Sequence, residues 1–326
     1  AILEVDNPPV NPLSDGVRYG LVECMEKAES DDSVVGIVLT GKGRSFIAGA
    51  DISEFGQQID GPSIHDAFEK IEKSSKPVIA AINGSALGGG LETALCCHYR
   101  VSSKQGFIGL PEVNLGLLPG AGGTQRLPRL VGPSEALKIM LSGRHIPAVK
   151  AVDMGVIDSL SEGDIVEDAV AFAKEVATKN DTHPLVRDLN DKVLAARGDE
   201  NIISEARALA AKTRKGQFAP GKIIQCVEAA INLDDFDEGM KKEAEYFIEC
   251  LLNPQREAMI HIFFGERAAS KINDVPKETP KMDVKKAGII GSGTMGGGIA
   301  MCFANIGIPV HIVDQDEENL KRGLSA

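Results

Sequence analysis

Residues 77–95 read PVIAAINGSALGGGLETAL, and this stretch decides the fold that we expect. Pro77–Ile82 is a short apolar run of the kind that forms a buried strand. A turn of three glycines follows at residues 88–90, and then a helical pattern that carries Glu92. A strand that passes through glycines into a helix favours an α/β fold with a ligand site on the turn.

Similar strand and helix patterns lie on both sides of this stretch. Val34–Thr40 and Phe107–Leu110 are predicted strands, whereas Asp15–Ser30 and Ser63–Lys73 are predicted helices. Strands that alternate with helices imply parallel pairing, so we expect the first half of the chain to be of the α/β class.

The second half has a different character, because helical patterns dominate from about Asp164. Asn253-Pro254 is a good helix start, with a capping residue before a proline, and the helix predicted from there to about Lys271 is amphipathic. Its apolar side carries Ala258, Ile262 and Ala269. We interpret this region as a helical layer between two domains.

A dinucleotide-binding pattern follows a polar segment with two prolines, Asn273–Asp283, which is predicted to be a linker. Ala287–Ile290 opens a new strand, and GSGTMG follows at residues 291–296. A second strand, Val310–Asp314, ends in an acid. A GxGxxG motif between two strands predicts the first βαβ unit of a Rossmann domain. The alternative is a glycine-rich turn in an unrelated α/β unit.

Composition excludes several classes of function. A net charge of -12 makes the chain a poor binder of nucleic acid, and the absence of Trp leaves no evident stacking surface. Local amides and a few basic side chains can still bind one anionic cofactor. None of the six cysteines forms a CxxC pair and no apolar run has membrane-spanning length, so we expect neither a metal site nor membrane insertion.

Glu92 lies about one turn into the helix after the glycines, among apolar residues. The first amides of a helix favour a negatively charged ligand, and apolar surroundings raise the pKa of a carboxylic acid. Glu92 is therefore a candidate acid–base group. The alternative is a glycine cluster that serves packing, with Glu92 as a solvated helix residue.

Glu112 lies in LPEVNLGLLPG, residues 110–120, also between apolar residues. Burying an isolated carboxylate is unfavourable unless it has a partner or a function. Taken alone, Glu112 is better explained by a salt bridge to a base such as Arg100. A third segment, SFIAGADI at residues 45–52, offers small residues with accessible amides, and its alternative is an ordinary turn before a helix capped by Asp51.

Together and in this order, the three segments resemble the crotonase superfamily, and more closely the enoyl-CoA hydratase part of multifunctional fatty-acid β-oxidation enzymes. The matching words are AGADI, ALGGGLETAL, GLPEVNLGLLPGAGGTQRLPR and AVDMGVID. The combination is highly specific. The resemblance covers the chain from its start to about residue 180, and the helical segment and the later GxGxxG stretch extend it over the whole length.

The resemblance implies a role for each of these residues. The amides of Ala50 and Gly89 would form an oxyanion hole for the thioester oxygen, where losing one donor costs roughly 3 to 4 kcal/mol. Glu92 and Glu112 would hold one water, one activating it for attack at C3 and the other exchanging the C2 proton. The pocket for coenzyme A would be lined by Ala48, Asp51 and Ile52.

The C-terminal stretch resembles the start of 3-hydroxyacyl-CoA dehydrogenase domains. The NAD pyrophosphate would meet the amides of Gly291, Gly293 and Gly296, and Asp314 would bind the adenosine ribose. The catalytic residues of such a domain would lie beyond Ala326. We therefore expect this chain to hydrate but not to oxidise its substrate.

We expect three regions: an α/β crotonase-like domain built as a ββα spiral over residues 1–180, a helical linking region over 181–280, and an incomplete Rossmann domain over 284–326. The expected function is hydration of trans-2-enoyl-CoA to 3-hydroxyacyl-CoA in fatty-acid β-oxidation, and Δ3,Δ2-enoyl-CoA isomerisation is a second activity that the resemblance allows. The intact enzyme would also oxidise 3-hydroxyacyl-CoA with NAD.

Two other functions compete with this one. The chain could be a dehydrogenase whose N-terminal domain mainly binds acyl-CoA, or a non-catalytic scaffold, which the presence of both Glu92 and Glu112 disfavours. Resemblance to the fused enzymes favours a monomer, with an oligomer as the alternative. The linking region favours the bacterial cytoplasm, with the peroxisome as the alternative.

Overall fold

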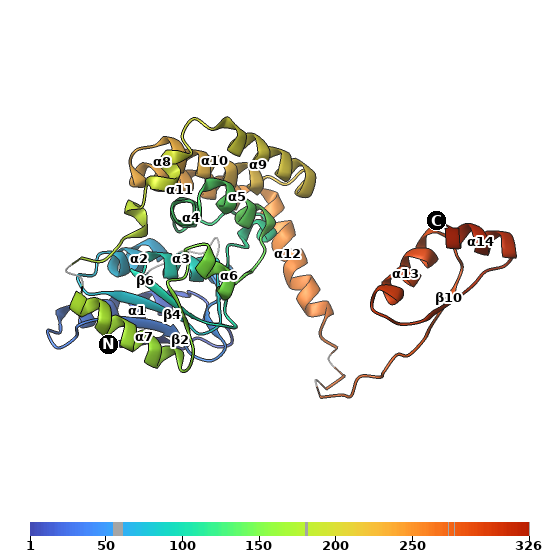
Figure 1. Ribbon diagram of the computed structural model, residues 1–326, viewed down its shortest axis with the longest axis horizontal. Coiled ribbons are helices and arrows are strands. Elements are labelled where there is room, and N and C mark those ends of the chain that lie inside the picture. Colours follow the sequence, from blue (N-terminus) through green and yellow to red (C-terminus); the bar gives the residue numbers. More distant parts are fainter. Residues whose placement is uncertain (55–60, 180–181, 273, 277, 326) are drawn as a thin grey trace. The chain divides into compact units, whose positions relative to one another are not determined.

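The computed structural model describes residues 1–54, 61–179, 182–272, 274–276 and 278–325. The chain divides into two compact units, Ala1–Arg267 and Ala268–Ala326. The first unit contains two sheets and most of the helices (Figure 1).

A five-stranded parallel sheet forms the base of the first unit, in the order β1-β2-β4-β6-β9. Its strands are β1 (Ile2–Val5), β2 (Ile37–Gly41), β4 (Val78–Ile82), β6 (Tyr99–Ser103) and β9 (Ser159–Ser161). Every residue of β2 and β4 is buried. This agrees with their continuous apolar runs, because a parallel sheet covered on both faces has no solvent side.

A second sheet runs in the order β3-β5-β7-β8, and its last pair is antiparallel. Its strands are β3 (Ser45–Ile47), β5 (Ser85–Leu87), β7 (Phe107–Gly109) and β8 (Ile146–Pro147). The chain passes from the first sheet to the second three times, through β2–β3, β4–β5 and β6–β7, and helical turns follow each passage. This repeat is the ββα spiral that the sequence predicts.

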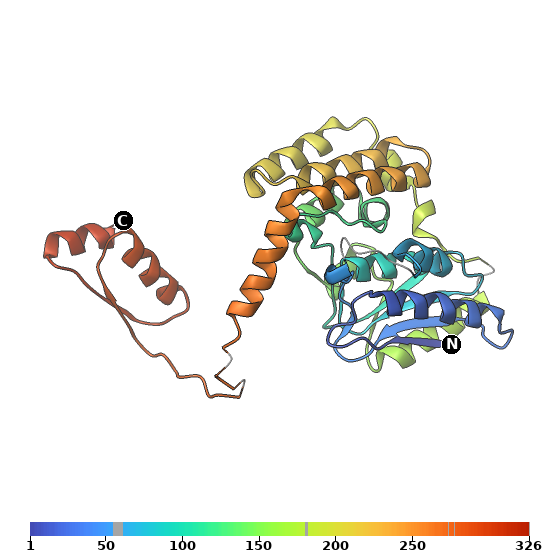
Figure 2. The ribbon, with the colours of Figure 1, turned by 180° about the vertical axis from the view of Figure 1, so that it is seen from behind.

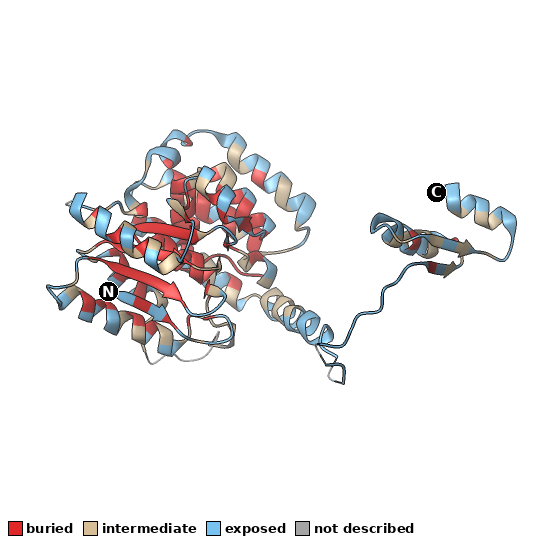
Figure 3. Ribbon diagram, turned by 60° about the horizontal axis from the view of Figure 1, so that its bottom comes forward, coloured by how far each residue is buried: buried red, intermediate tan, exposed pale blue. Residues whose placement is uncertain are grey.

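Helices cover the sheets and bury them, as the central buried strands in Figure 3 show. These helices are α1 (Asp15–Ser30), α2 (Ile64–Glu72), α3 (Gly89–Cys96), α6 (Ala148–Asp153) and α7 (Ile165–Lys179). Helix α7 packs on β2, β4 and β6, where Ala169, Ala173 and Val176 join a separate apolar cluster with residues of those strands.

A layer of further helices packs above α3 and belongs to the same compact unit as the sheets (Figure 2). It contains α4 (Gly123–Val131), α5 (Pro133–Ser142), α8 (Asp191–Ala195), α9 (Glu200–Thr213), α10 (Ala219–Asn232) and α11 (Phe236–Leu252). Helix α10 contacts α4, α5, α9 and α11. Short 3₁₀ turns are η1 (Ile52–Glu54), η2 (Glu112–Leu115) and η3 (Val186–Asp188).

Helix α12 (Pro254–Ala269) starts where the sequence predicts. The prediction that its apolar side packs against the rest of the protein is wrong. Ala258, Ile262 and Ala269 are exposed. The helix instead approaches Gly116, where an added Cβ would lie 3.1 Å from the Cα of Arg256 and 3.1 Å from the Sδ of Met259. Contact is therefore made by the first turns of the helix and not along a whole face.

The second unit contains a parallel pair of strands, β10 (Ala287–Ile290) and β11 (Val310–Val313), at the predicted positions. Helices α13 (Thr294–Asn305) and α14 (Glu317–Ser325) follow the two strands. Residues 273 and 277 of the predicted linker lie outside the described residues, and the others between 274 and 283 form neither helix nor strand. No helix in the described part of the chain is long and apolar enough to cross a membrane.

Candidate active site

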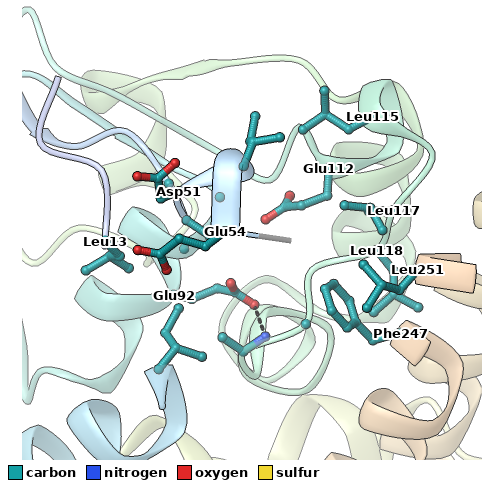
Figure 4. A pocket seen from close by; sticks show the side chains of 18 of the residues that line it. Leu13, Asp51, Glu54, Glu92, Glu112, Leu115, Leu117, Leu118, Phe247 and Leu251 are labelled. Atoms are coloured by element: carbon teal, nitrogen blue, oxygen red, sulfur yellow. Dashed lines mark hydrogen bonds between the residues drawn. The ribbon is translucent and has the colours of Figure 1, made fainter. Parts of the chain in front are cut away.

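A cavity of about 600 Å³ lies in the first unit. Its walls come from segments that are far apart in the sequence: the loop at 48–52, the start of α2, the turn at 88–92, the segment 111–121 and helix α11. Figure 4 shows the carboxylates of Glu92 and Glu112 directed into the same space, with Phe247 and Leu251 on another wall.

Glu92 lies in the first turn of α3, and its residue is only 3% exposed. Its Oε1 accepts the backbone N–H groups of Ala121 and Gly123, both at 2.8 Å. Glu92 is therefore not the solvated helix residue considered as its alternative. Two amide donors hold its carboxylate at the wall of the cavity.

Glu112 is the first residue of η2, and its buried Oε2 has no hydrogen-bond partner among the described residues. The salt bridge to Arg100 that would explain Glu112 as structural is wrong. Arg100 instead pairs with Asp158, at 3.2 Å between Nη2 and Oδ2, and donates to the carbonyl groups of Val156 and Cys97. The Glu112 carboxylate thus faces the cavity, and no Lys or Arg among the described residues forms an ion pair with it.

Burial raises the pKa of both carboxylic acids, but to different degrees. For Glu92 the amides of Ala121 and Gly123, with the charge of Arg126, oppose the rise. Burial, followed by the charge of Glu92, raises the pKa of Glu112 well above its usual range. Two acids whose surroundings separate their pKa values can act as a base and an acid in one reaction.

Ala50 and Gly89 bring two backbone amides together at the cavity. Gly89 begins α3, so its N–H has no acceptor within the helix, and Ala50 follows β3. Among the described residues, neither amide donates to a protein acceptor. A Cβ added at Gly89 would lie 3.1 Å from the Ala50 nitrogen. The two free donors are therefore neighbours, and this close approach requires glycine.

Ala48, Asp51 and Ile52 also line the cavity. The helix after Asp51 in the alternative interpretation of this segment is the short turn η1. Arg18, a buried residue of α1, secures this segment, because its Nη1 donates at 2.7 Å to both the Leu13 carbonyl and Glu54 Oε2. The loop is thus tied to the chain segment that precedes α1.

Sequence reasoning missed the contribution of α11. Ala244, Phe247, Ile248 and Leu251 line the cavity, and Glu243 is completely buried beside it. Glu243 Oε1 accepts the N–H of Gly122 at 2.6 Å, and its Oε2 accepts the N–H of Thr124 at 3.1 Å. One signal was present: Phe236, Gly239, Glu243 and Cys250 share one buried face, so an acid falls on the apolar side of an amphipathic helix.

The predicted NAD-binding residues all lie in the second unit. Gly291 has a φ of 96°, Gly293 precedes α13, and a Cβ at Gly296 would lie 1.8 Å from the Gly291 oxygen. This close, side-chain-free turn at a helix start fits a pyrophosphate group. Asp314 follows β11, and its Oδ2 accepts the N–H of Ser292 at 2.6 Å. No group of three or more His, Cys, Asp or Glu side chains among the described residues could hold a metal ion.

Known proteins are similar to this chain in both of its units. The family model for enoyl-CoA hydratase/isomerase matches residues 1–222, and the model for the NAD-binding domain of 3-hydroxyacyl-CoA dehydrogenase matches residues 286–326. A solved enoyl-CoA hydratase/isomerase from Pseudoalteromonas atlantica has a TM-score of 0.58 at 24% identity, over 81% of this chain and 93% of that one. The predicted fold class is thereby confirmed.

Two kinds of longer protein are similar over almost the whole chain. The peroxisomal bifunctional enzyme of Cavia porcellus is 39% identical over 98% of this chain and 45% of its own length. The fatty acid oxidation complex subunit alpha of a Shewanella species is 40% identical over 100% of this chain and 48% of its own length. The chain spans about half the length of these relatives.

Proposed function

Because the chain belongs to the enoyl-CoA hydratase/isomerase family, we propose that it adds water to a trans-2-enoyl-CoA and forms a 3-hydroxyacyl-CoA. One observation carries this proposal. Glu92, which is buried, and Glu112, whose Oε2 is buried, face the same cavity as the two free amides of Ala50 and Gly89. Water addition to a conjugated thioester needs a base, an acid and an anion-stabilising site, and these residues would supply all three.

The surroundings of the two glutamates support different roles. Glu92 accepts two amides, which favour its ionised form, so it suits the base that takes a proton from water as oxygen attacks C3. The pKa of Glu112 is raised well above its usual range and its Oε2 has no partner among the described residues, so it suits the acid that donates a proton to C2. One proton is taken and one is given, and the net change is the addition of one water.

The amides of Ala50 and Gly89 would stabilise the negative charge that forms on the thioester oxygen during attack. Such donors act without reorganisation because they belong to the backbone, and each contributes roughly 3 to 4 kcal/mol. The loop at Ala48, Asp51 and Ile52 adjoins these amides and would contact coenzyme A. Its small residues leave room for the cofactor's approach.

The fatty acyl chain would lie along the apolar wall of the cavity. This wall consists of Leu115, Leu117, Leu118, Phe247, Ile248 and Leu251. A fatty chain gains about 0.8 kcal/mol for each buried methylene. The cavity therefore favours a fatty enoyl thioester over a small polar one.

Isomerisation of a 3-enoyl-CoA to the 2-enoyl-CoA is a second candidate activity of the same site. It uses the same oxyanion site but moves a proton from C2 to C4 and adds no water. The unpartnered Oε2 of Glu112 favours it, because a carboxylate free of other partners can carry a proton between two carbons.

The second unit would bind NAD in a longer protein, where the cofactor supplies the hydride acceptor for oxidation of a 3-hydroxyacyl-CoA. Gly291, Gly293 and Gly296 would hold its pyrophosphate, and Asp314 would turn from Ser292 to the ribose.

We also propose the division of the chain into a crotonase-like domain over residues 1–180, a helical linking region over 181–280 and the start of a Rossmann domain over 284–326. A monomer in the bacterial cytoplasm remains our expectation, and the named relatives include a peroxisomal enzyme.

The direct test is loss of the conjugated-thioester absorbance of crotonyl-CoA on addition of the purified chain. We expect turnover by the wild-type chain and a large loss in the Glu92→Gln variant. A folded wild-type protein that removes no absorbance above the buffer control would refute hydration.

A further inference from the structure

We propose that Glu243 is a positioning residue for the hydration reaction, because it shares with Glu92 the backbone turn that starts α4. The inference rests on the proposed function. Glu243 does not line the cavity and would not touch the substrate. Its role would be to fix the turn whose amides hold the Glu92 carboxylate.

Four successive amides of this turn alternate between the two carboxylates. The N–H groups of Ala121 and Gly123 donate to Glu92 Oε1, each at 2.8 Å. Those of Gly122 and Thr124 donate to Glu243, at 2.6 and 3.1 Å. Because the donors alternate along one backbone, a shift of either carboxylate moves the amides that hold the other.

The turn is also the start of a helix, where the first amides have no partner within the helix and the dipole favours negative charge. One neutral capping side chain is usually enough at such a place. Here two carboxylates from α3 and α11 meet, and Glu243 is completely buried. Burial, followed by the charge of Glu92, raises the pKa of Glu243 to about 8. A buried second acid is more than capping alone needs.

Glu243 is itself held in place. The Thr124 hydroxyl donates to its Oε2, and Gln125 Nε2 donates to that hydroxyl at 3.0 Å and to the Cys226 carbonyl at 3.0 Å. On the other side of the turn, Arg126 Nη1 donates to the Ala121 carbonyl at 3.4 Å. The turn is therefore fixed by side chains from three helices, and Glu243 is the contribution of α11.

The main variant is Glu243→Gln, which keeps the shape of the side chain. Its carboxamide NH2 group would face one of the backbone N–H donors and cannot accept a hydrogen bond from it. The matched control is Glu245→Gln on the same helix, where the exposed carboxylate pairs with Lys242. We expect Glu243→Gln to lower kcat by roughly 10- to 100-fold with little change in acyl-CoA binding, because a misplacement of about 1 Å has effects of this size. Glu245→Gln should match the wild type.

A double-mutant cycle separates positioning from general damage. In the Glu92→Gln background, adding Glu243→Gln should cause no further loss of kcat, because the carboxylate that Glu243 positions is already gone. A smaller fraction of folded enzyme would lower kcat equally in both backgrounds. Equal losses in the two backgrounds would overturn the proposal.

A second readout needs no activity and so also applies if the chain is not a hydratase. In amide NMR spectra, Glu243→Gln should shift the signals of Gly122 and Thr124, which lose their acceptor, and also those of Ala121 and Gly123, which bind Glu92. Thr124→Val should shift the same four signals, whereas Thr124→Ser, which keeps the hydroxyl, should not. If only Gly122 and Thr124 move, Glu243 merely caps α4 and the proposal is wrong.

Discussion

At the scale of single residues, the site depends on two acids whose surroundings differ. Glu92 is tied to two amides, whereas Glu112 keeps one oxygen without a partner in the described structure. Glu92 is only 3% exposed, and the Oε2 atom of Glu112 is buried. Their chemistry is therefore set by burial and by each other.

Glu92→Gln and Glu112→Gln should each lower kcat by roughly 100- to 10,000-fold, because each removes an acid–base group. Acyl-CoA binding, measured by calorimetry, should change little, since other residues line the cavity. The double variant should be about as slow as the slower single one, because the two acids act as a unit. Glu162→Gln, in an exposed pair with Lys104, is the control and should behave as the wild type.

Gly89→Ala tests the oxyanion site. The added methyl group would lie 3.1 Å from both the Ala50 nitrogen and the Leu13 side chain, so the two amides must separate. We expect a loss in kcat of about 100-fold, as for removal of one oxyanion donor. Gly20→Ala in α1 meets no atom within 4 Å and should leave kcat unchanged. Wild-type kcat in Gly89→Ala would show that these amides do not serve the reaction.

At the scale of elements, α11 connects the helical layer to the cavity. It supplies Glu243 to the start of α4 and Phe247 to the apolar wall. The Phe247 ring packs directly on the turn, since a Cβ at Gly120 would lie 2.4 Å from it. The position of the proposed base, Glu92, and the proposed acyl pocket therefore depend on the same helix.

Phe247→Ala should widen the apolar wall and shift preference towards longer chains. The ratio of kcat/KM for a ten-carbon enoyl-CoA to that for crotonyl-CoA should rise by about tenfold, the usual scale for a change in pocket size. The matched control is Phe264→Ala on α12, where the side chain is 49% exposed and away from the cavity. An unchanged ratio would place the acyl chain elsewhere.

At the scale of the whole molecule, the buried acids affect stability as well as chemistry. The pKa of Glu243 rises from 4.5 to about 8 on folding. Between these values the folded chain binds more protons than the unfolded one, so the free energy of unfolding falls as the pH rises. The raised pKa values of Glu92 and Glu112 act in the same direction.

Glu243→Gln should therefore flatten this pH dependence. Chemical denaturation of the wild type from pH 5 to 8 should show a decrease in unfolding free energy of the order of a few kcal/mol. The variant should lose part of this slope, and Glu245→Gln should keep all of it. A variant with the wild-type slope would mean that Glu243 titrates normally in the folded chain.

Local patterns in the sequence determined the elements and the family. Helix α1 and strand β10 begin and end where the patterns predict, because apolar periodicity, caps and turn residues act over a few positions. Strand β11 begins as predicted and ends one residue earlier, at Val313. The words around Ala50, Glu92 and Glu112 were enough to propose the chemistry. They are short, contiguous and specific, and therefore visible in a single sequence.

The tertiary structure alone decided which distant side chains meet. It paired Arg100 with Asp158 and left Glu112 without a basic partner among the described residues. It also placed the contacts of α12 at Gly116 and not along the predicted apolar side of that helix. It also brought Glu243 to amides about 120 positions earlier in the chain. Such contacts depend on how whole helices pack, and a helical pattern shows which face is buried but not what covers it.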